Sequence, residues 1–274
     1  MKYILLAITF FISFLSFSQE KGKDKEKEKE KKSKLESKYL YKDASVETDD
    51  YNIYIVDIVA AEGQAKFKIR IFNKTNDYLL VKPTEFLYTS GGKSIYSKDK
   101  TYVVPPNEEE SEVVDFKDKG MMVENFTVEF KGIYKASAGG KPIPVPDFEL
   151  PATTKEFTVE NCTCTLKKAD LATDKSVVRF DCTYNGDGVS IINPVKASLI
   201  MPNGVENANT KKHKPLILEK GKTDDFFMVY LEVKGAGDMQ KKKTQVKWND
   251  TFRESKVLQI GGAKINFEKE TGKR

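Results

Sequence analysis

Two stretches of this sequence share one pattern of apolar residues at a constant spacing of 111 residues, and this repeat limits the fold more than any other feature. The segment 52–83 aligns without gaps on the segment 163–194, so Pro83 corresponds to Pro194. Few aligned residues are identical, but a shared pattern at one spacing is typical of a duplicated structural unit. We therefore predict two copies of one fold, with Pro83 and Pro194 in equivalent positions.

Within each copy, apolar and polar residues alternate. The segments 67–71 and 178–182 both place apolar side chains at every second position, which is typical of a half-buried strand. Such runs are short and are divided by turn signals, of which Asn203-Gly204 is the strongest. This pattern favours a β-sandwich of about seven strands over an α/β fold. The residues expected in the two cores are Ile53, Phe67, Ile69, Ile71, Phe86 and Phe130 in the first copy, and Cys164, Val178, Phe180, Cys182 and Trp248 in the second.

The first copy has a fixed order of strand, polar, apolar and turn residues over about residues 52–131. The features in order are Phe67–Phe72, Asn73, Leu79–Val81, Phe86, Gly91-Gly92, Pro106–Glu108 and Val113–Phe116. This order resembles the Ig-like β-sandwich domains of the immunoprotective extracellular antigen type, which occur in exported bacterial proteins. The second copy departs from it, with Tyr184 where the first has Asn73. The resemblance implies two tandem Ig-like antiparallel sandwiches and export, and it implies no catalytic residues.

The N-terminus is typical of a secretory signal peptide. Lys2 precedes a run of apolar residues from Ile4 to Phe17, and small residues at Ser16 and Ser18 suit cleavage before Gln19. The alternative is an uncleaved anchor, but a spanning helix needs about 20 apolar residues and this run is shorter. We expect residues 1–18 to be removed, so that the mature chain is exported to the periplasm or the extracellular space without a transmembrane segment.

Residues 19–38 are rich in lysine and glutamate and contain almost nothing to bury, so we predict a disordered tether. Electrostatic attachment to an anionic surface is the alternative. The sandwich domains are expected at 39–155 and 156–274. The proline-rich segment 142–146 follows a Gly-Gly pair that mirrors Gly261-Gly262 in the second copy, and proline suits an edge strand. We therefore assign this segment to the first domain, the alternative being a proline-rich ligand for another protein.

The chain has three cysteines, which in an exported protein implies one disulfide and one remaining thiol. A turn centred on residue 173 places Cys164 opposite Cys182, on the side of each strand expected to face the core. We predict a Cys164–Cys182 disulfide, and a small change of register would select Cys162 instead. The pair Cys162 and Cys164 also resembles metal ligands, but structural zinc usually takes four ligands, so no metal is expected.

No catalytic motif is found. The only histidine, His213, lies among Lys211, Lys212 and Lys214, which would lower its pKa and keep it on an exposed loop. The acidic run at 108–112 suits a solvated turn, and a weak Ca²⁺ site is the alternative. Paired carboxylates of the glycosidase kind leave no sequence motif, so a carbohydrate-active hydrolase or its accessory domain is the alternative to a non-enzymatic protein. No cofactor is expected.

Charge is distributed unevenly. Residues 40–155 contain 15 basic and 19 acidic residues, a net of −4, whereas residues 156–274 contain 21 and 16, a net of +5. The excess lies in two runs that are expected to be loops, Lys211, Lys212 and Lys214 in one and Lys241, Lys242 and Lys243 in the other. We predict that these loops contact an anionic partner, such as a polysaccharide or an acidic protein of the cell envelope. Lysines that only maintain solubility are the alternative.

The leading hypothesis is therefore an exported, non-enzymatic protein of the bacterial envelope or extracellular space that presents the loops of its β-sandwiches to a macromolecular partner. Nucleic acid is not an expected partner, because export removes it from reach and no aromatic residues interleave with the lysine runs. A purely structural spacer is a further alternative.

Overall fold

The computed structural model describes residues 39–232, 234–235 and 238–269. Nearly all of the regular structure in this part of the chain is antiparallel β-sheet, so the predicted all-β fold is confirmed. Two 3₁₀ turns, η1 (Pro83–Glu85) and η2 (Pro194–Lys196), interrupt the strands. The predicted signal peptide and tether, residues 1–38, lie outside the described residues. Within the described residues, no helix is long and apolar enough to span a membrane.

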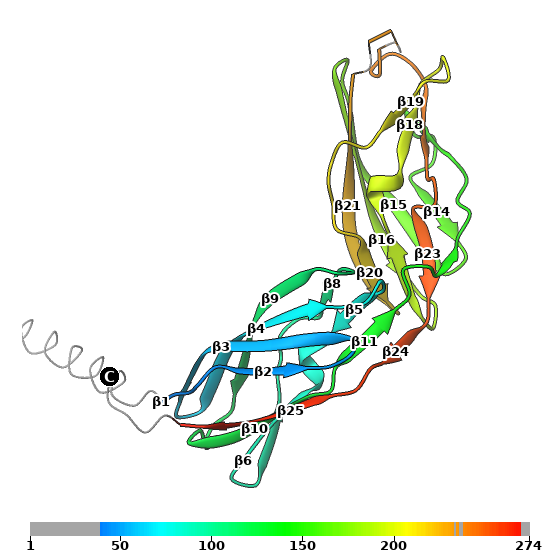
Figure 1. The fold of residues 1–274 in the computed structure, drawn as a ribbon. Coiled ribbons are helices and arrows are strands. Elements are labelled where there is room, and N and C mark those ends of the chain that lie inside the picture. The colour runs from blue at the N-terminus through cyan, green and yellow to red at the C-terminus, as the bar shows by residue number, and fades with distance from the viewer. Residues whose placement is uncertain (1–38, 233, 236–237, 270–274) are drawn as a thin grey trace, which may run out of the picture.

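The first sandwich consists of two layers around one core (Figure 1). One layer contains β1 (Tyr39–Leu40), β2 (Ala44–Glu47), β3 (Tyr51–Ala61), β4 (Gln64–Asn73) and β9 (Glu109–Lys117). The other contains β5 (Tyr78–Val81), β6 (Phe86–Ser90), β7 (Lys93–Tyr96), β8 (Tyr102–Val104), β10 (Asn125–Phe130) and β11 (Ile133–Ala136). This second layer is divided into two successive four-stranded sheets, with the turn η1 between β5 and β6.

The second sandwich repeats this order of strands. One layer contains β14 (Glu156–Val159), β15 (Cys162–Leu171), β16 (Lys175–Tyr184) and β21 (Lys222–Leu231). The other contains β17 (Val189–Ile192), β18 (Ser198–Ile200), β19 (Glu206–Ala208), β20 (Leu216–Glu219), β22 (Thr244–Lys247) and β23 (Phe252–Ser255). Pro83 and Pro194 each begin the 3₁₀ turn at the same point of the two sandwiches, as the repeat predicts.

Each sandwich is completed by strands from the other half of the chain. After β11, the chain crosses to the second sandwich, where β12 (Lys141–Pro142) pairs with β23 and β13 (Phe148–Leu150) pairs with β22. After β23, it returns to the first, where β24 (Val257–Gln259) pairs with β11 and β25 (Ala263–Glu268) pairs with β10. In Figure 1, β24 and β25 lead away from the second sandwich and run along the first. The two copies of the fold thus exchange their last strands reciprocally.

This exchange corrects the expected division of the chain after residue 155. Ile143, Phe148 and Leu150 lie in the core of the second sandwich, whereas Ile265 and Phe267 lie in that of the first. The proline-rich segment does lie at a sheet edge, with Pro142 in β12, but in the second sandwich and not the first. The physical reason is that both copies offer the same unpaired strand edge, so an apolar pattern alone does not specify which copy a strand completes.

The core residues predicted from alternation are all buried, from Ile53 to Phe130 in the first sandwich and from Cys164 to Trp248 in the second. Phe67 contacts the rings of Phe116, Phe130 and Phe267, with centroids 6.1, 6.2 and 6.1 Å away. Since Phe267 comes from the exchanged strand β25, the first core combines residues from both ends of the described chain.

A third, smaller apolar cluster joins the two sandwiches. Leu80 of β5 and Ala136 of β11 pack against Val189 and Ile191 of β17. The repeat relates Leu80 to Ile191, so equivalent faces of the two sandwiches meet. Two ion pairs also cross this junction, Lys82 with Glu219 and Lys214 with Glu110. Together with the exchanged strands, these contacts join the two sandwiches at an angle, so that the molecule has the shape of an elbow (Figure 1).

Candidate functional site

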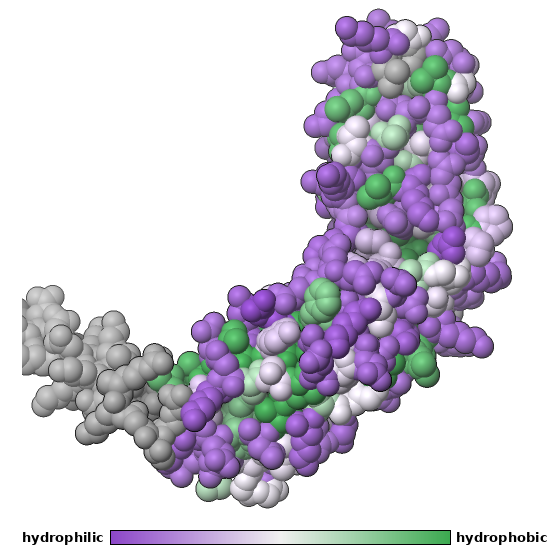
Figure 2. All heavy atoms as spheres, in the orientation of Figure 1, coloured by the Kyte–Doolittle hydropathy of each residue, from purple (hydrophilic) through white to green (hydrophobic). Residues whose placement is uncertain are grey.

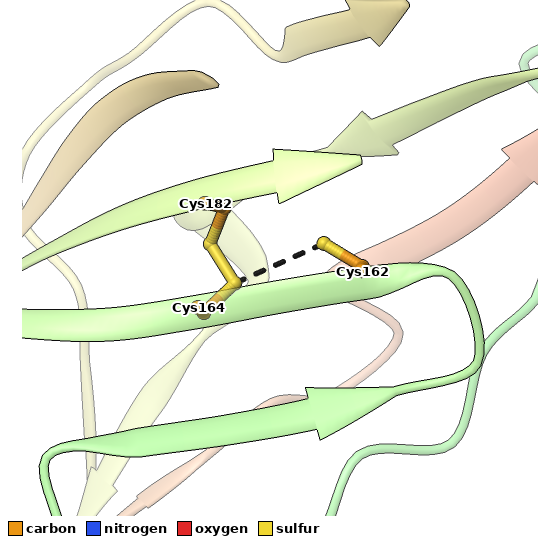
Figure 3. Close-up of side chains that lie close together, drawn as sticks. All are labelled: Cys162, Cys164 and Cys182. Carbon is orange, nitrogen blue, oxygen red and sulfur yellow. Dashed lines mark hydrogen bonds between the residues drawn. A yellow bond between two sulfur atoms is a disulfide. The ribbon is translucent and has the colours of Figure 1, made fainter. Parts of the chain in front are cut away.

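The three cysteines lie together in the core of the second sandwich (Figure 3). Cys164 of β15 is directly opposite Cys182 of β16, with a Cα–Cα distance of 4.1 Å, and the two form the predicted disulfide. Cys162 points to the same side of β15, and its Sγ lies 3.8 Å from that of Cys164. The sequence left Cys162 and Cys164 as alternatives, and the register of β15 on β16 selects Cys164.

Cys162 is a buried free thiol. Burial raises its pKa to about 11, and a hydrogen bond with Ser190 opposes that shift. The three sulfur atoms are close enough together to hold a metal ion. However, two of them share a disulfide bond, and a disulfide sulfur is not the thiolate that zinc or copper(I) takes as a ligand. In this oxidised form, the cluster stabilises the core.

We expect alkylation without reduction to label Cys162 alone, and only after denaturation. In the native protein, burial and a pKa of about 11 leave almost no reactive thiolate at pH 8. Replacing Cys164 and Cys182 together by Ala should lower the free energy of unfolding by about 3 kcal/mol, since their sequence separation of 18 closes a loop of that length. Mass spectrometry of non-reduced digests checks the pairing. Labelling of Cys164 or Cys182 without reductant would contradict it.

His213 is placed differently from the expectation. It is half-buried, with its ring edge-on to Phe227 of β21 at a centroid distance of 4.5 Å. Its pKa is lowered, as expected, but burial is the main cause and Lys211 contributes less. Its Nε2 is buried without a hydrogen-bond partner. The imidazole therefore packs beside β21, although the loop that carries it is exposed at Lys211, Lys212 and Lys214.

The acidic run at 108–112 enters β9, and two of its four carboxylates are in ion pairs. Glu109 binds Arg70 of the neighbouring strand, and Glu110 binds Lys214 of the second sandwich. The expected solvated turn is thus mostly strand. Two of these carboxylates neutralise basic side chains, which leaves fewer ligands for the alternative Ca²⁺ site.

Both lysine runs lie in loops, but the structure does not bring them together. The loop with Lys211, Lys212 and Lys214 descends along β21 toward the junction. Within this loop, Lys211 lies over the ring of Phe227 of β21. Lys241 pairs with Asp238, which also binds Thr173 in the turn between β15 and β16. That turn lies at the end of the second sandwich far from the junction (Figure 1). The two runs therefore cannot form one patch.

A cleft of about 1040 Å³ between the two sandwiches, here called the elbow cleft, is lined by Lys214 of the first run. The first sandwich contributes the loop 98–101 with Val103 of β8, and the second contributes residues 214–217 and the start of β21 at 222–225. Leu80, Val103 and Ile217 form an apolar strip along it, continuous with the cluster that joins the sandwiches. Figure 2 shows that hydrophilic residues otherwise cover most of the visible face.

Charges of both signs line the elbow cleft in equal number, five lysines and five acidic residues. Two of the acidic groups are in ion pairs, Glu219 with Lys82 and Asp225 with Arg179, and Asp99 accepts hydrogen bonds from Ser97 and the backbone N–H of Asp115. Three of its lysines, Lys98, Lys100 and Lys222, are exposed and have no ion-pair partner among the described residues. Glu85, Asp99 and Asp224 also have no ion-pair partner among the described residues, so the lining is balanced in charge.

Reasoning from the sequence did not identify Lys98, Lys100 and Lys222. They do not form a run, and they lie in segments more than 100 residues apart. One signal was present, since the segment 98–100 alternates lysine and aspartate just before a strand. Only the packing of β8 beside β20 gives that segment a partner surface.

No protein-family model matches the sequence, and neither does any curated protein. Among solved structures, the chain has some similarity to the secreted serine protease VesC from Vibrio cholerae, at 9% sequence identity and a TM-score of 0.18. That match covers 71% of this chain and 48% of VesC, so the chain spans about half the length of that protein. The resemblance to Ig-like domains remains a prediction from the sequence.

Proposed function

We propose that this protein is an exported, non-enzymatic interaction protein of the bacterial cell envelope or extracellular space, and that it binds an anionic macromolecular partner through the lysine loop 211–214 beside the elbow cleft. The observation that carries this proposal is the loop itself, in which Lys211 and Lys212 are exposed and have no ion-pair partner among the described residues. The signal peptide predicted from the sequence supports export. The Cys164–Cys182 disulfide is compatible with it, because disulfides persist in oxidising compartments.

The alternative of a carbohydrate-active hydrolase has less support. A glycosidase acid needs a carboxyl group with a raised pKa. In the described residues, every carboxyl group with a perturbed pKa has it lowered, mainly by hydrogen bonds to the charged form. These groups are Glu124, Glu129, Asp187, Glu206, Asp238 and Asp250. This pattern favours a binding role over carboxylate catalysis.

Two charge-reversal variants test the proposal. Replacing Lys211, Lys212 and Lys214 by Glu, beside the cleft, should reduce salt-sensitive retention on isolated cell envelopes at least tenfold, because the partner is attracted by positive charge. Replacing Lys241, Lys242 and Lys243 by Glu makes the same change of charge at the far end of the second sandwich and should leave most retention intact. Sedimentation with envelopes at several salt concentrations measures both.

The outcomes separate the hypotheses. Loss of retention in the 241–243 variant alone would place the contact at the tip of the second sandwich. Unchanged retention in both folded variants would contradict the proposal and support lysines that maintain solubility.

A further inference from the structure

The loop of residues 209–214 covers the free edge of β21. This strand is the last of its sheet and pairs only with β16. On its other side, Thr210 donates its backbone N–H to the carbonyl of Val229 at 2.9 Å, and Val229 donates its own N–H to Oδ1 of Asn209, also at 2.9 Å. The loop thus satisfies both backbone groups of Val229 that would otherwise be unpaired at this edge.

His213 extends this cover to Phe227, two residues along the strand. The imidazole is edge-on to the ring of Phe227 and donates a hydrogen bond to the backbone carbonyl of that residue. Its Nε2 is buried without a hydrogen-bond partner, so the donor is Nδ1. The docked imidazole is therefore neutral, with its proton on Nδ1 and a free lone pair on Nε2.

The docked position of His213 does not suit the charged form of the ring. A proton added to Nε2 would form a buried N–H group that has no acceptor among the described residues. A buried donor without a partner costs free energy, and it costs more when the group is charged. The surroundings of Nε2 therefore favour the neutral ring.

The charged groups around the imidazole do not offset this cost. Lys211 of the same loop repels the charged ring, and the next residue, Lys214, is paired with Glu110 of β9. Asp225 of β21 attracts the charged ring, but Arg179 of β16 binds the same carboxylate at 2.7 Å. Burial and the repulsion by Lys211 outweigh that attraction, so the pKa of the imidazole lies below its ordinary value.

Protonation of His213 favours release of the loop, because the docked loop binds the proton less tightly than a released loop does. Docking is at full strength above the ordinary pKa of histidine, about 6.5, and weakens as the pH falls below that value. Release also removes Lys211 from the ring of Phe227, where its Nζ lies 5.2 Å from the centroid. With His213 protonated, every residue of the segment 211–214 carries a positive charge.

We infer that mild acid releases the loop 209–214 from the edge of β21 and thereby strengthens its binding to an anionic partner. This inference rests on the proposed function and identifies the regulation of that site. The chain has only one histidine, and histidine is the side chain that ordinarily titrates between pH 5 and 8. The pH response of the protein in this range should therefore arise in this loop.

Two measurements on the full mature protein test the release without any partner. In NMR titration, the single histidine signal should give a pKa below that of the denatured chain. Hydrogen exchange at pH 5 and pH 7.5, corrected for intrinsic rates, should show that the amides of Thr210 and Val229 lose protection in acid. The amide of Phe180, in the middle of β16, should stay protected at both pH values and serves as the control.

Retention on dextran sulfate resin tests the effect on binding, since the sulfate groups of the resin stay ionised at both pH values. His213→Phe keeps a ring, His213→Gln keeps an N–H donor, and neither variant titrates. Between pH 7.5 and pH 5, we expect retention of the unmodified protein to rise about threefold more than that of either variant, because only its loop gains a charge and is released.

Several outcomes would overturn the inference. They are a histidine pKa equal to that of the denatured chain, unchanged protection of Thr210 and Val229 in acid, and the same rise in retention for the protein and both variants. If retention still depends on Lys211, Lys212 and Lys214, these outcomes leave the proposed function intact. Retention that is unchanged at both pH values when these three lysines are replaced by Glu would contradict the proposed function as well.

Discussion

Ending the chain after Lys256 should unfold the first sandwich and leave the second folded. The truncation removes β24 and β25, and with them Ile260, Ile265 and Phe267 from the first core. Burial of three such side chains contributes roughly 5–9 kcal/mol, at about 1.5–3 kcal/mol each. That is comparable to the whole stability of an ordinary domain, about 5–15 kcal/mol. The second sandwich keeps β12 and β13, so its own core remains complete.

The single tryptophan makes this measurable. Trp248 lies in the core of the second sandwich, so its fluorescence reports unfolding of that sandwich, whereas hydrogen exchange in β4 and β10 reports the first. We expect the Trp248 transition to persist while exchange protection in β4 and β10 is lost. A chain that ends after Lys269 retains β25 and serves as the control. Adding a synthetic peptide of residues 257–269 should restore protection, and protection that survives the truncation would contradict the exchange of strands.

Replacing Phe67 by Ala should lower the free energy of unfolding of the first sandwich by about 3–5 kcal/mol. Phe67 is 1% exposed and touches three other rings, so the truncation leaves a cavity that the surrounding strands cannot easily fill. Denaturant unfolding followed by far-ultraviolet circular dichroism measures the loss. The Trp248 transition should hardly change, because Phe67 and Trp248 belong to different cores.

Tyr96 provides the matched control for Phe67. It is also an aromatic strand residue of the first sandwich, but it is 58% exposed, so Tyr96→Ala should cost at most about 0.5 kcal/mol. An equal effect of the two substitutions would contradict the assignment of Phe67 to the core.

Much of the local structure follows from the sequence because it depends on neighbours along the chain. Alternation at 67–71 determines which side chains face the core, whichever strand lies alongside. The equivalence of Pro83 and Pro194 was likewise readable from spacing alone. The disulfide needed more than its turn, because a β-bulge between Leu166 and Lys168 shifts the register of β15 on β16 by one residue, and this shift brings Cys164 opposite Cys182.

The partner of each final strand and the makeup of the cleft were decided only by tertiary structure. Both copies present the same open edge beside β10–β11 and β22–β23, and the apolar residues of 143–150 and 260–267 follow one pattern. The chain crosses between the copies where Leu80 and Ile191 join them, since the cluster there includes Ala136 at the end of β11 and Val257 at the start of β24. That same packing of distant segments unites Lys98 and Lys100 with Lys222. The sequence by itself determined two alternating β-sandwich patterns with their cores, since these rest on local periodicity. The exchanged strands and the elbow cleft rest on contacts between segments far apart in the chain, and local periodicity does not specify such contacts.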